Sequence, residues 1–259
     1  MKNKQNKELA ICGIAAVKAL VKEHPEKIRR FYFNTERVSM FGQLCKYLAQ
    51  NRIPYNKVEN IDLEKLSGTV HHQGAVAMID VPEIPQLTSD IVNKWVEKKE
   101  NAVLLDCVGN ANNLGAIIRS AVFFGITNII IPMNDSQSSI TTSTYRVAQG
   151  GMEYVQVYTV RSTARFLQDV NGKMIRIGTD VRAKETVSSL ENCKNKPSII
   201  ILGNEEFGIS DVVKENCDKL VVIPSYFMKK RGNSKNQPVE SLNVAQASSI
   251  IFYELSKSF

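Results

Sequence analysis

The chain has 259 residues, 43% of them hydrophobic, which is enough to bury the core of one large or two modest domains. No run approaches the ~20 apolar residues of a membrane span, and the basic N-terminus lacks the apolar segment of a signal peptide, so membrane-spanning and secreted proteins are not expected. The net charge of +7 favours a polyanionic partner such as nucleic acid, and a membrane surface is the weaker alternative.

Helices and strands are expected to alternate through the first 80 residues. Helical spacing from Glu8 ends at Pro25, and later prolines and glycines separate the segments that follow. Strands are predicted at 28–34, 55–60 and 74–81, and further helices at 40–54 and 63–68. A proline-containing linker at 82–90 then leads to a helix at 89–101, with Ser89 or Asp90 as its N-cap.

The remainder of the chain alternates more regularly. Apolar strands are predicted at 102–108, 127–132, 154–160, 174–180, 198–205 and 219–224, and helices at 114–125, 138–152, 162–170, 209–217 and 244–259. Buried strands separated by helices predict a mostly parallel sheet covered on both faces. The expected domains are 1–80, a linker with the start of a helix at 81–98, and 99–259.

The cysteines and histidines indicate neither disulfides nor a metal site. The five cysteines lie far apart without CxxC spacing, which is typical of reduced thiols in a cytoplasmic protein. His71 and His72 are adjacent, and neighbours on a strand point to opposite faces, so no metal is expected there.

The first candidate site motif is GNANNLGAIIR, directly after the predicted strand 102–108. Asn113 is one of several amides in it, Gly115 permits a close backbone approach, and Arg119 lies one helical turn further on. In parallel sheets, ligands bind where strands end. A capped helix with a surface arginine explains this motif alone equally well.

The second motif, LGNEEFGIS, follows the apolar strand 198–205 and holds Gly203, Glu205 and Gly208. Its glycines expose backbone groups, and Glu205 places a carboxylate at the strand end. It matches neither the GxGxxG fingerprint nor a phosphate loop, which argues against a conventional nucleotide-dependent enzyme. Simple turn chemistry is the alternative.

The third motif runs from VVIP at 221–224 through a basic stretch to VESLNVAQASS. Ser241 and Asn243 open the last predicted helix, where either residue could be an ordinary cap. Capping does not explain why three separate strand-end loops share glycine, amide and charged residues.

Together, NNLGAIIRSA, LGNEEFG and IP…VESLNVAQA resemble the three signature motifs of the SpoU (TrmH-type) branch of the SPOUT RNA methyltransferases, in the same order over 101–259. The N-terminal unit, ending in HHQGAVA, is similar to the L30e-like substrate-binding domain of that family. The resemblance implies an α/β SPOUT domain with a parallel sheet and a deep trefoil knot, and a homodimer with its active site near the interface.

The resemblance also implies S-adenosylmethionine as cofactor and a ribose 2′-hydroxyl of rRNA or tRNA as methyl acceptor, with rRNA favoured by the N-terminal domain. The implied cofactor-binding residues are Leu202, Gly203, Ile223, Leu242 and Asn243. The implied catalytic residues are Asn113, Arg119, Glu205, Ser241 and Asn243.

The chemistry of Arg119 restricts its role. The resemblance implies a general base, but a guanidinium normally stays protonated. Holding an RNA phosphate and stabilising the developing alkoxide is therefore the preferred interpretation.

Two departures from the family pattern stand out. Asn110-Ala111 replaces the usual Asp-Pro, and Tyr226–Pro238 is much longer than the usual link. This insertion is either a solvated loop or an RNA-contacting one. The predicted RNA-binding residues are Arg119 and the basic residues of the insertion, Lys229, Lys230, Arg231 and Lys235. Two alternatives stay open: a catalytically inactive RNA-binding relative, and methylation of a base rather than a ribose.

Overall fold

A computed structural model describes residues 8–133, 137–193, 195–204, 206–226, 239 and 241–257. The chain divides into two compact units, each described here by itself. Unit 1 comprises Met1–Glu83 with Ser139–Tyr154, and unit 2 comprises Ile84–Ser138 with Val155–Phe259. The sequence-based boundaries at 80 and 99 stay a prediction.

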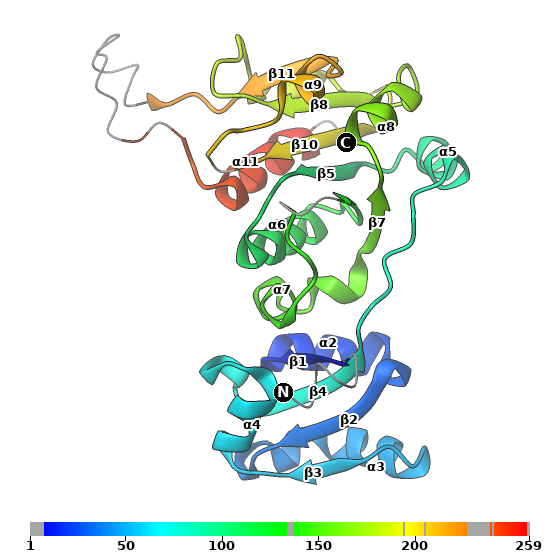
Figure 1. The fold of residues 1–259 in the computed structure, drawn as a ribbon, viewed down its shortest axis with the longest axis vertical. Helices are drawn as coiled ribbons and strands as arrows, with labels where there is room; N and C mark the ends of the chain where they lie inside the picture. Colours follow the sequence, from blue (N-terminus) through cyan, green and yellow to red (C-terminus); the bar gives the residue numbers. More distant parts are fainter. Residues whose placement is uncertain are drawn as a thin grey trace. The chain divides into compact units, whose positions relative to one another are not determined.

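Unit 1 is built on a four-stranded sheet of order β1-β4-β2-β3 (Figure 1). Strand β4 runs antiparallel to β1 and β2, whereas β2 and β3 are parallel. Its strands are β1 (Glu8–Cys12), β2 (Ile28–Phe33), β3 (Tyr55–Lys57) and β4 (Ala75–Asp80). Its α-helices are α2 (Ile14–Glu23), α3 (Gly42–Gln50), α4 (Asn60–Ser67) and α7 (Thr142–Ala148), and its short 3-10 helices are Pro25–Lys27, Thr35–Phe41, Val70–His72 and Gly151–Tyr154.

The helix predicted from Glu8 to Pro25 is wrong over its first five residues. Glu8–Cys12 is strand β1, and the chain turns at Gly13 with φ +91° before α2 begins. A left-handed φ is costly for residues other than glycine, so Gly13 separates two apolar segments that periodicity alone joins.

The strand geometry assumed for His71 and His72 in the argument against a metal site is also wrong. The pair lies in a 3-10 helix, where His72 is buried and its Nδ1 accepts a hydrogen bond from the Gly74 amide at 3.0 Å. Within the described residues, no group of three or more His, Cys, Asp or Glu side chains is placed to hold a metal ion.

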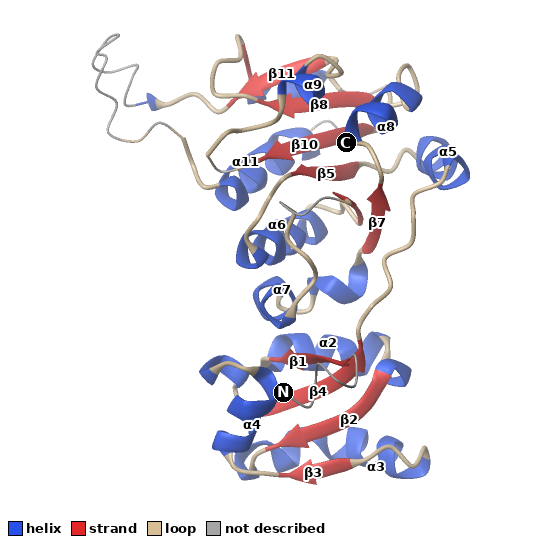
Figure 2. Cartoon of the chain, in the orientation of Figure 1, coloured by secondary structure: helices blue, strands red, loops and turns tan. Residues whose placement is uncertain are grey.

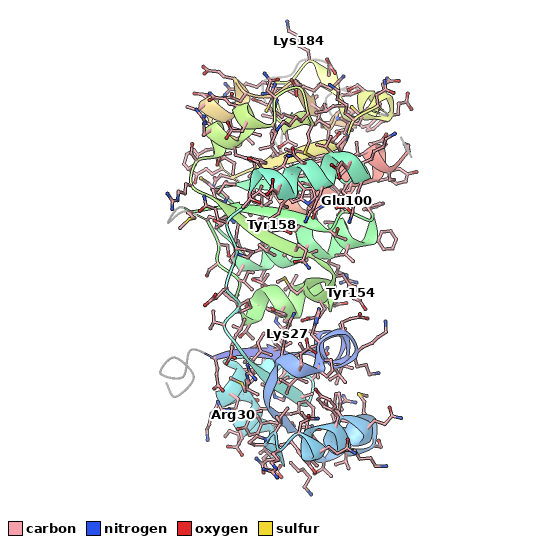
Figure 3. The ribbon with its side chains drawn as sticks, turned by 90° about the vertical axis from the view of Figure 1, so that its right-hand side faces the viewer. Lys27, Arg30, Glu100, Tyr154, Tyr158 and Lys184 are labelled. Carbon is pink, nitrogen blue, oxygen red and sulfur yellow. The ribbon has the colours of Figure 1, made fainter. Side chains whose placement is uncertain are left out.

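The segment Ser139–Tyr154 packs on α2 within unit 1. Gly150, with φ +95°, approaches so closely that a Cβ there would lie 2.7 Å from the Cβ of Ala19. Lys27 Nζ lies 3.6 Å from the buried carboxylate of Glu153, whose pKa is raised by burial and lowered in part by Lys27. The Tyr154 hydroxyl donates to Glu23 at 2.9 Å in a second link between this segment and α2, and Figure 3 labels Tyr154 and Lys27.

Unit 2 is a seven-stranded, wholly parallel sheet of order β7-β6-β5-β10-β8-β11-β9, which confirms the predicted parallel α/β class. Its strands are β5 (Ala102–Asp106), β6 (Asn128–Pro132), β7 (Gln156–Val160), β8 (Ile175–Thr179), β9 (Glu185–Thr186), β10 (Ser198–Gly203) and β11 (Lys219–Val222). Its helices are α5 (Ser89–Lys98), α6 (Ala111–Phe123), α8 (Thr163–Asp169), α9 (Asp211–Lys214), α11 (Val244–Ser256) and the 3-10 helix Val187–Asn192.

Helices cover the unit 2 sheet, as Figure 2 shows. Alternate strand residues such as Leu104 and Ile201 pack with Trp95 of α5 and Phe166 of α8 in one core cluster. Tyr158 stacks edge-on against Trp95 at 5.5 Å between ring centroids. Helices α6 and α11 pack against each other, and α11 also contacts β10. None of the described helices is long and apolar enough to cross a bilayer.

Helix starts follow side-chain caps that the sequence indicates only approximately. The N-cap of α5 is Thr88, whose hydroxyl accepts from the Ile91 amide, and not Ser89 or Asp90.

The two-residue strand β9 has no counterpart among the predicted strands, because it is shorter than any periodic pattern.

An ion pair between the buried Arg176 and the partly exposed Asp218 ties β8 to the turn before β11. Arg176 is only 8% exposed, and Asp218 receives hydrogen bonds from its Nε at 2.9 Å and its Nη2 at 2.6 Å. The same guanidinium donates to the Leu167 carbonyl and to Asn171. The hydrogen bonds from Arg176 lower the pKa of Asp218 below its usual range.

We expect Asp218→Ala to lower the free energy of unfolding by about 3 kcal/mol, because it leaves a buried guanidinium without its counter-charge. The Asp218 carboxylate stabilises the fold above its unfolded pKa, and that contribution is lost as the pH falls through the lower folded pKa. Urea unfolding at pH 7 and at pH 3 measures both effects. Asp211→Ala, which removes an exposed carboxylate, is the control and should change stability by less than about 0.5 kcal/mol. Equal destabilisation in both variants would contradict this assignment.

Candidate functional site

The candidate site lies at the carboxyl edge of the unit 2 sheet, where β5 and β10 end side by side. Gly203 is in register with Asp106 across the parallel pair. Because all strands of this sheet run parallel, the loops after β5, β10 and β11 leave from the same edge. The three sequence motifs therefore belong to one edge of one sheet.

Two asparagines join the first and third motifs. Asn113 lies in the first turn of α6, and Asn243 is the N-cap of α11, accepting from the Ala245 amide at 2.9 Å. The Asn243 Nδ2 donates to Asn113 Oδ1 at 3.2 Å, across 130 residues of sequence. The structure thus brings together two of the predicted site residues.

The departure at Asn110-Ala111 has a local explanation. Asn110 is the N-cap of α6, and its Oδ1 accepts from the Asn112 amide at 2.8 Å. Asparagine and aspartate are about equally good N-caps, and alanine is a good helix former directly after one. The helix therefore begins at Ala111, three residues earlier than predicted, without the usual Asp-Pro.

The second motif folds back on itself in a tight loop. The Asn204 and Gly208 backbones exchange hydrogen bonds, each at 3.0 Å, and Asn204 Oδ1 accepts from the amides of Glu206 and Phe207. A Cβ on Gly203 would lie 2.2 Å from backbone atoms of Gly208 and Ile209. Only glycine fits at this strand end.

Sequence reasoning missed three residues that hold these loops. The buried Asp106 carboxylate accepts from the Ser210 amide at 2.8 Å, and Asn204 Nδ2 donates to the Cys107 carbonyl at 3.0 Å. Gln137 makes a two-way amide pair with the backbone of Val108. The available signal for Asp106 is a carboxylate that ends an otherwise apolar strand, AVLLD.

Arg119 lies on α6, two turns beyond the amide pair, and is exposed. No hydrogen bond or ion pair of its guanidinium occurs among the residues that the structure describes. On a helix it shares a face with Gly115 and Phe123, the latter 81% exposed. A single chain thus presents Arg119 to solvent.

The other predicted site residues surround the same loops. Leu202 is buried at the end of β10, Ile223 follows β11 and is half-buried, and Ser241 and Leu242 are exposed directly before α11. Glu205 and the predicted RNA-binding residues Lys229, Lys230, Arg231 and Lys235 lie outside the described residues.

This arrangement favours binding through backbone groups over nucleophilic catalysis. The described residues at 206–208, 223–225 and 241–243 carry peptide groups outside strands and helices, and Asn113 and Asn243 add a pair of neutral amides at the same sheet edge. The thiols of Cys12 and Cys217 are poor nucleophiles, because desolvation raises the pKa of Cys12 to about 11 and that of Cys217 to about 12.

The fold defined by this sheet is that of SpoU methyltransferases. AviRb from Streptomyces viridochromogenes, solved in complex with AdoMet, superposes with a TM-score of 0.73 at 22% identity over 99% of this chain and 92% of its own. The chain belongs to the SpoU rRNA Methylase family, whose model matches residues 100–253. A second model, for RNA 2′-O ribose methyltransferase substrate binding, matches residues 10–85. The family predicted from the three motifs is confirmed.

Relatives match over different lengths. A Pseudomonas putida protein named 23S rRNA (guanosine-2′-O-)-methyltransferase RlmB is 28% identical over 247 residues, 94% of each chain. A Haemophilus influenzae protein named as an uncharacterized tRNA/rRNA methyltransferase is 32% identical over 158 residues, 61% of this chain and 44% of its own length. The chain therefore spans less than half of the second relative.

Proposed function

We propose that the chain transfers a methyl group from S-adenosylmethionine to a ribose 2′-hydroxyl of ribosomal RNA. The observation that supports this proposal is that the family motifs lie at one sheet edge, where Asn243 is hydrogen-bonded to Asn113 and where the Gly203 loop begins. The matching of both family models, and a 94% overlap with a relative named for guanosine-2′-O methylation of 23S rRNA, support the reaction and substrate.

The strand-end loops suit S-adenosylmethionine, whose sulfonium supplies an activated methyl group. The backbone of Gly208 and Ile209 takes the space that a Gly203 Cβ would fill, so glycine lets the loop close tightly at the strand end, where its peptide groups would face the cofactor. Leu202, Ile223, Leu242 and Asn243 would contribute further backbone contacts around it. Asp106 and Asn204 keep the loop in place through the hydrogen bonds at Ser210 and Cys107.

The remaining residues would orient the acceptor. Arg119 holds the neighbouring RNA phosphate and stabilises the developing alkoxide, since a guanidinium is a poor proton acceptor but a strong charged donor. Asn113 positions the ribose or Arg119, and Glu205 orients groups around the site. Ser241 and Asn243 complete the pocket.

The proposal that the substrate is RNA rests on the N-terminal unit and on the positive net charge of the chain. Residues 10–85 match the substrate-binding model, and the chain carries a net charge of +7. The basic residues of 226–238 would add phosphate contacts. Domain limits of 1–80 and 99–259, a cytoplasmic location and the absence of a bound metal stay predictions.

The test is label transfer from methyl-labelled S-adenosylmethionine to separate pools of undermethylated 23S rRNA and tRNA. We expect label in the 23S rRNA. Label confined to tRNA would overturn the proposal that ribosomal RNA is the substrate. Cofactor binding by calorimetry without transfer to either pool would instead identify a catalytically inactive RNA-binding relative.

A homodimer through α6 and α11 is the second part of this proposal. These helices pack together through Ser120 and Ser249, whose hydroxyl oxygens lie 2.8 Å apart. Phe123 and Tyr253, on the same two helices, are 81% and 52% exposed. A two-fold contact over these rings would bury them and bring Arg119, one turn before Phe123, to the interface.

We expect Phe123→Glu to weaken dimerisation about 100-fold, because it places a charge in an apolar contact. Analytical ultracentrifugation across a concentration series measures this. Ile61→Glu, a matched change at an exposed position of α4 in unit 1, should leave the dimer unchanged. A monomeric native chain, or an unchanged dimer in Phe123→Glu, would contradict this interface.

A deep trefoil knot in the C-terminal domain is the third part. Its support is the contact of α11, the last helix, with α6 and with the 3-10 helix Val187–Asn192, segments that precede it by many residues. Slow refolding that persists after all X-Pro bonds are equilibrated would be the kinetic signature.

A further inference from the structure

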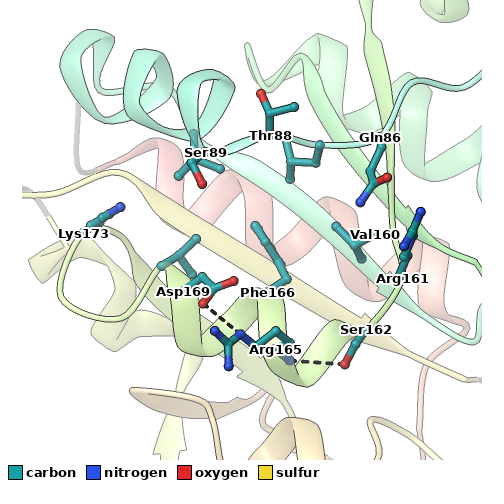
Figure 4. A pocket seen from close by; sticks show the side chains of 13 residues that line it. Gln86, Thr88, Ser89, Val160, Arg161, Ser162, Arg165, Phe166, Asp169 and Lys173 are labelled. Atoms are coloured by element: carbon teal, nitrogen blue, oxygen red, sulfur yellow. Dashed lines mark hydrogen bonds and ion pairs between the residues drawn. The ribbon is translucent and has the colours of Figure 1, made fainter.

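A cavity lies in unit 2 at the carboxyl end of the edge strand β7 (Figure 4). Its volume is about 280 Å³, and its lining comes from two stretches, 86–92 and 160–173. None of the lining residues belongs to the candidate methyl-transfer site. The cavity is therefore not explained by the proposed cofactor pocket.

The rim of this cavity carries more positive than negative charge. Arg161, Arg165 and Lys173 line it, and Asp169 is the single carboxylate of the lining. Asp169 is paired with Arg165 at 3.2 Å, while Arg161 and Lys173 have no carboxylate partner among the described residues. In Figure 4 these two cations stand at opposite ends of the cavity, with Phe166 between them.

Three hydroxyl-bearing residues, Thr88, Ser89 and Ser162, belong to the lining of the same cavity. Thr88 Oγ1 accepts from the Ile91 amide at 3.4 Å, and Ser162 Oγ accepts from the Arg165 amide at 3.3 Å. Because each hydroxyl uses its oxygen as the acceptor in these caps, its own O–H can donate to a ligand. Ser89 adds a third hydroxyl beside Thr88.

The floor is apolar but offers little surface for a base. Val160, Phe166 and Val170 are 6%, 8% and 1% exposed, since the fold itself covers them. A stacked nucleobase would need an open ring face. Two separated cations, in a lining that also carries hydroxyl groups, suit the phosphates and ribose of a nucleic-acid backbone instead.

We propose that this cavity binds the phosphodiester backbone of the RNA substrate, as a contact separate from the methyl-transfer site and independent of base sequence. The proposal rests on the proposed RNA substrate. A free phosphate or mononucleotide offers the same chemistry, so the experiment below separates the two sources.

The test uses the full chain with Arg161→Gln and Lys173→Gln combined, which keeps the Arg165–Asp169 pair. The control is Arg182→Gln with Lys184→Gln, the same change of charge at exposed positions of unit 2 outside the cavity. Filter binding to 23S rRNA is measured from 50 to 300 mM salt. We expect about tenfold weaker binding in the cavity variant, and a salt slope reduced by about 0.7–0.9 for each phosphate that this variant no longer neutralises, with the control unchanged.

Calorimetry adds two measurements. S-adenosylmethionine should bind the cavity variant and the native chain with equal affinity, because the cavity is separate from the proposed cofactor site. If the native chain does not bind S-adenosylmethionine, that result would count against the proposed function alone. Equal RNA binding by native and cavity variants, or equally weakened binding in cavity variant and control, would overturn the RNA contact. Binding of 5′-GMP that is abolished in the cavity variant, with RNA binding intact, would assign the cavity to a free nucleotide and also overturn it.

Discussion

Gly203→Ala is expected to reduce S-adenosylmethionine binding by at least about 100-fold. The added Cβ would lie 2.2 Å from the backbone of Gly208 and Ile209, a distance at which the loop must move. No flexible side chain can absorb this displacement, because the contacting atoms are backbone. The loop that moves is the one whose peptide groups are proposed to hold the cofactor.

Two further glycine variants make this result interpretable. Gly208→Ala meets no atom within 4 Å but has φ +71°, so its cost is backbone strain of about 1–2 kcal/mol and its effect should be intermediate. Gly42→Ala is the matched control, because its Cβ meets open space at an ordinary helical φ of −58°. Circular dichroism at the assay temperature establishes that each variant is folded. Native-like cofactor affinity in folded Gly203→Ala would contradict the assigned pocket.

Arg119→Ala is expected to slow single-turnover methyl transfer by about 100- to 1,000-fold, the range for removing one charged donor from a transition state. Cofactor affinity should stay unchanged, because Arg119 makes no hydrogen bond or ion pair to the described residues of the loops at 203–208 and 241–243. Arg119→Lys should recover part of the rate, since it keeps the charge but loses the two-pronged donor geometry.

The control for Arg119→Ala is Arg182→Ala, an exposed arginine outside the proposed site. Rapid-quench kinetics at saturating cofactor separate chemistry from binding. A native single-turnover rate in Arg119→Ala would remove Arg119 from the reaction. A slower rate together with weaker cofactor binding would show that Arg119 acts on the fold of the site.

The regular part of the fold follows from local sequence, and the exceptions are informative. The buried strands of unit 2 are apolar runs bounded by glycine and proline, so their parallel arrangement is predictable. Glu8–Cys12 is not, because AICGIAA is apolar throughout and only the left-handed Gly13 shows where strand becomes helix. Helix α6 begins at Ala111 because the Asn110 side chain caps it, an effect of one hydrogen bond.

The sequence predicts which motifs form the candidate site, but not how the side chains of those motifs contact one another. Asn113 and Asn243 both belong to the predicted site, but their hydrogen bond depends on how α6 packs on α11. Asp106 and Asn204 act on loops more than 90 residues away in sequence, so no local pattern reveals their partners, although the carboxylate of Asp106 is unusual at the end of an apolar strand. The cavity at β7 combines two stretches that sequence periodicity treats as a linker and a helix.

Ribose methylation is tested most directly by nucleoside mass spectrometry of 23S rRNA after reaction with the native chain and deuterated S-adenosylmethionine. We expect one nucleoside whose mass increase stays with the ribose fragment, at a single position of the RNA. A mass increase on the base fragment would contradict ribose methylation, and no labelled nucleoside despite cofactor binding would contradict methyl transfer altogether.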